Sequence, residues 1–128
     1  MATRIHIDPD RRFVVFAIES PYTIDEWRAG LEDLLATDVF RETRRVLVDR
    51  RAADPPTARF VDDMMRFFAS HRADLGICYG AIVVRDEAGF GMGRMTQLKS
   101  EFEIPDVSMR AFREYDQAIA WLLGSGND

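Results

Sequence analysis

Short apolar segments alternate with segments of helical spacing along nearly the whole chain. Patterns typical of β-strands lie at residues 3–8, 12–19, 44–49, 76–84 and 107–112. Helical patterns begin at Thr23 and at Thr57 and also cover residues 88–102 and 114–123. Because strands that alternate with helices pair in parallel through right-handed crossovers, this order predicts one α/β domain with the element order ββαβαβαβα.

The first two predicted strands form an exception to parallel pairing. Asp8, Pro9 and Asp10 between them make a turn sequence, so this pair should be an antiparallel hairpin. We therefore expect a mostly parallel five-stranded sheet with an antiparallel first strand. The domain should occupy residues 1–124, with Gly124 as the C-cap of the last helix and a frayed tail at 125–128.

Length, charge and cysteine content narrow the class of protein. A chain of 128 residues can form one domain with a real core. A net charge of -5 argues against general binding to nucleic acids, which requires cations for the phosphates. The chain begins without a signal-peptide pattern, and its apolar runs are too short for a membrane span. With Cys78 as its single cysteine, we expect a cytoplasmic protein.

The C-terminal half carries motifs of a known family. The strand GAIVV, the helix start GFGMGRM and the ending VSMRAFREYDQAIAWLLG resemble the SpoIIAA-like proteins of the STAS superfamily. In that group a closing strand ends in Phe-Arg, here Phe112-Arg113, and the last helix carries Ala-x-x-Trp-Leu, here residues 118–122. The resemblance implies sequentially stacked βα units. It also implies relatives that act as phosphorylation-switched antagonists in sigma-factor control, as transporter tails or as small-ligand binders.

The switch of those antagonists is a serine at the start of the helix after the third strand, within Asp-Ser-Ser-Gly. Asp49 matches the opening aspartate, but no serine follows it, and Thr57 is the nearest hydroxyl, after an insertion with two prolines. Thr57 is therefore the positional candidate for phosphorylation, although we expect none.

Five polar residues follow or end the third predicted strand: Asp49, Arg50, Arg51, Asp54 and Thr57. Ligands of α/β sheets bind beyond the carboxyl ends of parallel strands, and a helix N-terminus there favours an anion. These residues are one candidate binding site. The alternative is a turn with capping aspartates and solvated arginines.

A stripe of aromatic and methionine side chains is the second candidate site. It consists of Phe60, Met64, Phe67 and Phe68 with Phe90, Met92 and Met95. The stripe is wider than one core contact requires, so it could be core, a homodimer surface or the wall of an apolar pocket. Helices gathered on one face of the sheet would leave apolar surface uncovered, and this favours self-association.

The sequence contains no recognisable motif of a catalytic, metal-binding or cofactor-binding site. The glycines Gly89, Gly91 and Gly93 do not make a GxGxxG fingerprint, and His6 and His71 lack partners at ligand spacing. We expect no cofactor, no metal and no catalytic residues. The sequence favours a non-enzymatic STAS-like regulatory module that binds protein, and the expected partners are a second copy of the chain and another regulatory protein. The alternatives are a carrier of an apolar ligand or lipid, and a hydrolase or transferase with its site near Asp49 and Asp86.

Overall fold

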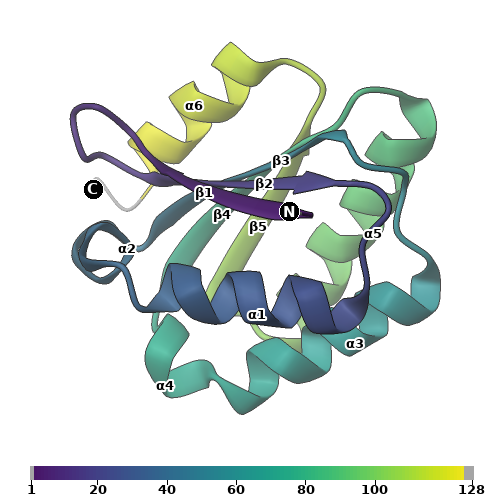
Figure 1. Cartoon of the computed structure of the whole chain (residues 1–128), viewed down its shortest axis with the longest axis horizontal. Coiled ribbons are helices and arrows are strands. Elements are labelled where there is room, and N and C mark those ends of the chain that lie inside the picture. The colour runs from purple at the N-terminus through teal and green to yellow at the C-terminus, as the bar shows by residue number, and fades with distance from the viewer. Residues whose placement is uncertain (1, 126–128) are drawn as a thin grey trace.

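A computed structural model describes residues 2–125 of the chain (Figure 1). The elements in chain order are β1 (Thr3–Ile7), β2 (Val14–Glu19), α1 (Ile24–Leu35), α2 (Asp38–Thr43), β3 (Arg45–Ala52), α3 (Ala58–Ser70), α4 (Arg72–Leu75), β4 (Cys78–Val83), α5 (Glu87–Glu103), β5 (Val107–Phe112) and α6 (Tyr115–Gly124). The five strands form one sheet in the order β1-β2-β3-β4-β5. β1 is antiparallel to β2 and the other pairs are parallel, so the predicted fold class is confirmed.

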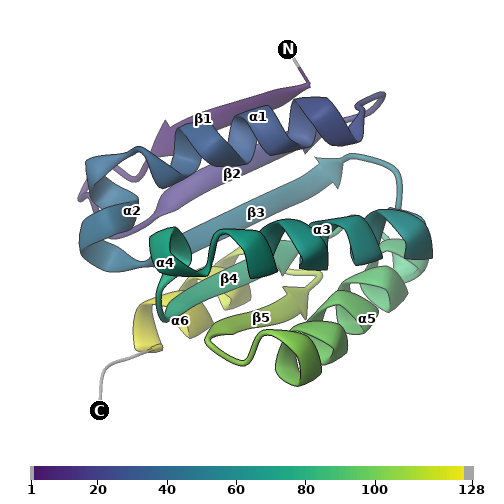
Figure 2. The same cartoon turned by 90° about the horizontal axis from the view of Figure 1, so that it is seen from below.

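Helices cover both faces of the sheet. Figures 1 and 2 show α1 and α3 below the sheet, α5 beside β5, and α6 alone on the upper face. The larger core lies under α1 and α3, whereas α6 buries Ala118 and Leu122 against Leu47, Ala81 and Val83. The expectation that helices on one face would leave the other uncovered is therefore wrong for β3, β4 and β5.

Several predicted boundaries are shifted. The third strand does not end at Asp49 but continues to Ala52, and the short helices α2 and α4 were not expected. α6 includes Gly124, so the prediction of Gly124 as the C-cap is wrong, and Ser125 is the C-cap. The Ser125 hydroxyl donates to the carbonyl of Trp121 at 2.8 Å. The rest of the expected tail, residues 126–128, lies outside the described residues.

The predicted helix starts are confirmed. Thr23 accepts a hydrogen bond from the Glu26 N–H at 3.1 Å, and the Glu26 side chain accepts one from the Thr23 N–H at 3.0 Å. This capping box fixes the first turn of α1. Thr57 caps α3 in the same way by accepting from the Phe60 N–H at 3.1 Å.

α5 lies against β5 and covers the edge of the sheet. Gly93 makes the close approach possible, because a Cβ there would lie 2.8 Å from the Cβ of Ala111. The Gln97 side chain accepts a hydrogen bond from the Ala111 N–H at 3.4 Å, and the Ser100 hydroxyl donates to the Val107 carbonyl. These contacts occupy backbone groups that an exposed edge strand would offer to another chain.

Candidate functional site

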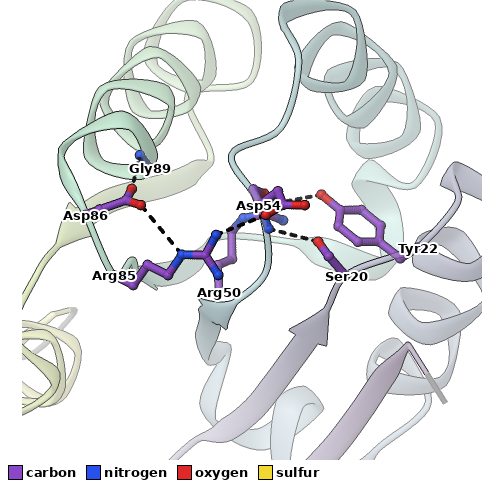
Figure 3. Close-up of polar contacts among 7 residues, drawn as sticks. All are labelled: Ser20, Tyr22, Arg50, Asp54, Arg85, Asp86 and Gly89. Atoms are coloured by element: carbon purple, nitrogen blue, oxygen red, sulfur yellow. Dashed lines mark hydrogen bonds and ion pairs between the residues drawn. The ribbon is translucent and has the colours of Figure 1, made fainter.

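Three loops meet where the parallel strands end, and Asp54 connects them (Figure 3). The Asp54 N–H donates to the Ser20 hydroxyl at 2.8 Å, which joins the loop after β3 to the loop after β2. The Asp54 carboxylate accepts from Arg85 Nη2 at 2.9 Å, which adds the loop after β4. The Asp54 carbonyl accepts from Arg50 Nη2, also at 2.9 Å. The polar part of the site is thus held together by one aspartate.

Arg50 is a buried cation in this cluster. Its side chain extends from β3 on the face that carries α1 and α3, and only 7% of the residue is exposed. Arg50 Nη2 also donates to the Tyr22 hydroxyl oxygen at 2.5 Å, and the guanidinium lies 5.4 Å from the centre of the Tyr22 ring. Both hydrogen-bond acceptors are neutral groups.

Arg85 and Asp86 complete the cluster at the start of α5. The Asp86 carboxylate accepts from the Gly89 N–H at 2.9 Å and so acts as the N-cap of α5. Its other oxygen lies 3.5 Å from Arg85 Nε. The carboxylates of Asp54 and Asp86 therefore share Arg85 as their cationic partner, as Figure 3 shows.

The structure does not bring together the five polar residues predicted as one site. Because β3 continues to Ala52, successive side chains alternate between the faces of the sheet, and Asp49 and Arg51 lie opposite Arg50. Arg51 Nε and Nη2 each lie 2.9 Å from an Asp49 carboxylate oxygen, and the Arg51 guanidinium lies 4.6 Å from the centre of the Tyr115 ring. Of the five, Arg50 and Asp54 share direct contacts on one side, and Asp49 and Arg51 on the other.

The environment of Asp49 does not suit a general acid. Partial burial pushes the pKa of Asp49 upward, but the hydrogen bonds from Arg51 outweigh burial, and the pKa lies below its ordinary value. Asp49 is thus ionised and paired at neutral pH. Asp86 acts as a helix cap and lies at the start of α5, so the two acids considered for a hydrolase have separate structural roles.

Thr57 lies at the start of α3 with its side chain exposed. Its hydroxyl oxygen is occupied as the acceptor of the α3 cap. The expectation that Thr57 is not phosphorylated stays a prediction.

Three members of the aromatic and methionine stripe belong to the core. Met64, Phe67 and Phe68 are 7%, 5% and 5% exposed, and Phe67 and Phe68 both pack edge-on against Trp27. Phe60, Phe90, Met92 and Met95 are half-buried. Most of the width of this stripe is therefore explained by contacts within the chain.

An apolar cavity of about 60 Å³ lies between the sheet and its helices. Its wall includes Phe16, Trp27, Val48, Met64, Gly80 and Gly93, and Arg50 is its charged lining residue. Drug-sized ligands occupy pockets of roughly 300–1,000 Å³, so a lipid chain does not fit in this form of the protein.

Ser20, Tyr22 and Arg85 belong to the site but are not among the residues that the sequence patterns predicted for it. Their position after β2 and β4 was the available signal, because parallel strands end at the same edge of a sheet.

Among residues 2–125, no group of three or more His, Cys, Asp or Glu side chains could hold a metal ion. Within the same residues, no helix has the length and apolar character required to cross a bilayer.

The order of the strands, their pairing and the helix layers on the two faces of the sheet together define a SpoIIAA-like α/β fold. A crystal structure of an uncharacterised protein of the DUF3478 family from Shewanella loihica PV-4, described as having a SpoIIAA-like fold, superposes with a TM-score of 0.59. The similarity covers 94% of this chain and 92% of that chain at 17% sequence identity. This likeness confirms the predicted SpoIIAA-like fold. No family model and no curated protein matches the sequence.

Proposed function

We propose that this chain is a non-enzymatic, STAS-like regulatory module that works by binding protein, and that it binds a second copy of itself through α5. The fold supports a module of the STAS type, and the surface of α5 supports the mode of binding. The single observation that carries the proposal is a stripe of four side chains on α5, Arg94, Leu98, Glu101 and Phe102, which we call the α5 stripe.

The α5 stripe lies on one side of the helix. Its members are spaced i, i+4, i+7 and i+8, which places them on a continuous face. Phe102 is 87% exposed and Leu98 is 48% exposed. An exposed aromatic ring beside an exposed leucine is apolar surface that a partner can bury.

The charged members of the α5 stripe are also available. Within residues 2–125, the side chains of Arg94 and Glu101 form no hydrogen bond or ion pair, whereas Lys99 on the same helix lies 2.5 Å from Asp62. Two-fold pairing of antiparallel helices centred on Leu98 brings Arg94 of one copy to Glu101 and Phe102 of the other. The stripe is therefore self-complementary, as a two-fold interface requires.

A charge-exchange experiment tests this pairing. Sedimentation of the full chain at tens of micromolar should show a dimer, and Phe102→Asp, Arg94→Glu or Glu101→Arg should each shift it towards monomer. The double variant Arg94→Glu with Glu101→Arg should restore the dimer, because the two charges exchange places across the interface. Ile7→Asp, at the β1 edge on the far side of the sheet, is the matched control and should leave the dimer unchanged.

A monomeric wild-type chain under these conditions would contradict the proposal. A dimer that survives all three single substitutions would show that copies associate through another surface.

A further inference from the structure

Arg50 has a charge that the described part of the protein does not neutralise. Among residues 2–125, no carboxylate lies within ion-pair distance of its guanidinium, although Arg12, Arg51, Arg85 and Arg113 each have one. An isolated buried cation strongly destabilises the folded state unless it is paired. Two neutral acceptors and the Tyr22 ring offset part of this destabilisation. In the contacts among residues 2–125, both acceptors bind the same guanidinium nitrogen, Nη2.

The nearby carboxylates are committed to other groups. Asp54 pairs with Arg85, and Asp86 pairs with Arg85 and caps α5. The structure thus keeps both acids away from Arg50 while holding Arg50 in place through the Asp54 carbonyl. This arrangement leaves a fixed positive charge for an anion from outside the chain.

The cavity limits the size of that anion and requires an apolar part in it. Arg50 lines the apolar cavity of about 60 Å³, and so do Pro56, Val84 and Gly89, which lie beyond the carboxyl ends of β3 and β4. An apolar cavity of about 150 Å³ holds benzene. The cavity beside Arg50 has less than half of that volume, so it accommodates a chain of about two to four carbons. The Tyr22 hydroxyl accepts from Arg50 and still has its own proton to donate to an anionic oxygen.

We propose that Arg50 and this cavity bind a short-chain monocarboxylate. The carboxylate oxygens accept hydrogen bonds from the Arg50 guanidinium and the Tyr22 hydroxyl, and the alkyl chain occupies the apolar space beside Val48 and Val84. Charge-assisted hydrogen bonds of this kind are stronger than neutral ones. The site does not depend on the α5 stripe, since it is enclosed by β3, β4, α1, α3 and α5 within one copy.

Titration of the full chain with butyrate, followed by NMR, tests the site. Butyramide has the same shape without the charge and should bind at least about tenfold more weakly. Arg50→Met should weaken butyrate binding by at least about tenfold, whereas Arg51→Met should change it less than about twofold, because Arg51 faces Asp49 on the other side of the sheet.

Gly80 is a second control position, because it pairs with Val46, four residues before Arg50 on β3. A Cβ at Gly80 would lie 3.6 Å from Met109 Cε and 3.6 Å from Val46 Cγ1, which is ordinary contact, so Gly80→Ala should fold and should change butyrate binding less than about twofold. The length of the ligand tests the cavity itself, and acetate should bind more weakly than butyrate. Octanoate should bind more weakly than butyrate, because its chain exceeds the cavity.

Several results would overturn the proposal. Equal binding of butyrate and butyramide by the wild-type chain excludes recognition of the charge, whether or not Arg50→Met folds. Inorganic phosphate that competes fully with butyrate, together with equal binding of acetate and butyrate, indicates an anion site without the cavity. NMR spectra of the protein that do not change at any concentration of butyrate indicate that no site exists.

Discussion

Arg50 and Arg51 are adjacent arginines with opposite environments. Arg50 is buried among Tyr22, Asp54 and the cavity, and Arg51 is exposed and paired with Asp49. The difference follows from the two-residue period of a strand. Val46 and Val48 are apolar, so the same period places Arg50 on the apolar face. The alternation of Val46, Val48 and Arg50 is the signal in the sequence that places Arg50 on this face. The predicted third strand ends at Asp49, so it does not include Arg50.

Replacement of Thr23 tests the capping box of α1. Thr23→Ala should lower the free energy of unfolding by about 1 kcal/mol, because the Glu26 N–H loses its acceptor. Urea unfolding measures the change. Thr23→Ser keeps the hydroxyl and should remain within about 0.5 kcal/mol of the wild type. A loss below about 0.3 kcal/mol for Thr23→Ala would show that the cap does not stabilise the helix in solution.

Cys78 should react slowly with thiol reagents while the protein is folded. Burial raises the pKa of the Cys78 thiol to about 11, so at about pH 8 roughly one thiol in a thousand is ionised. We expect alkylation to be at least about a hundredfold slower in buffer than in urea. Because the folded state retains the proton, this thiol favours folding below about pH 8.5, and that contribution declines as the pH rises towards 11. Equal rates in the two solvents would place the thiol at the surface.

At the scale of single elements, α5 has glycines with different roles. Gly91 faces open space, so Gly91→Ala should raise the free energy of unfolding by about 0.5–1 kcal/mol through helix propensity. Gly93→Ala places a Cβ 2.8 Å from the Cβ of Ala111 and should destabilise the protein by about 1–3 kcal/mol. Thermal and urea unfolding of both variants measure the difference. Stabilisation by both substitutions would mean that α5 does not approach β5 this closely.

The elements that sequence patterns missed are short and depend on tertiary contacts. α2 has six residues, too few to show helical periodicity, and its C-cap, Arg44, has a φ of 56°. A positive φ is uncommon outside glycine. Arg44 Nη1 donates to the Leu75 carbonyl at 2.9 Å, which ties this turn to the end of α4. Such a contact joins segments distant in sequence, and local propensity does not predict it. The longer elements were predicted because their periodicity and caps are local.

At the scale of the whole molecule, the sheet has unequal cover. α1, α3 and α5 enclose one face, and α6 alone covers β3, β4 and β5 on the other. The second and fourth strands are apolar at successive residues, a pattern typical of strands that are covered on both faces. Ala118, Ile119 and Leu122 have helical spacing, which is typical of a helix with an apolar face. Neither pattern tells which face of the sheet that helix covers. That choice is set by chain crossovers, so the second face could not be assigned from sequence alone.

The same substitution at two phenylalanines tests the division between core and surface across the molecule. Phe67 is 5% exposed and contacts Trp27, so Phe67→Asp should unfold the protein, because it buries a charge with no partner. Phe102 is 87% exposed, so Phe102→Asp should keep the free energy of unfolding of the monomer within about 0.5 kcal/mol of the wild type. Circular dichroism and urea unfolding of both variants, at protein concentrations low enough to exclude association, give the comparison. A folded Phe67→Asp variant that lost only self-association would instead make the aromatic and methionine stripe the interface between copies, and the α5 stripe would then have no role in it.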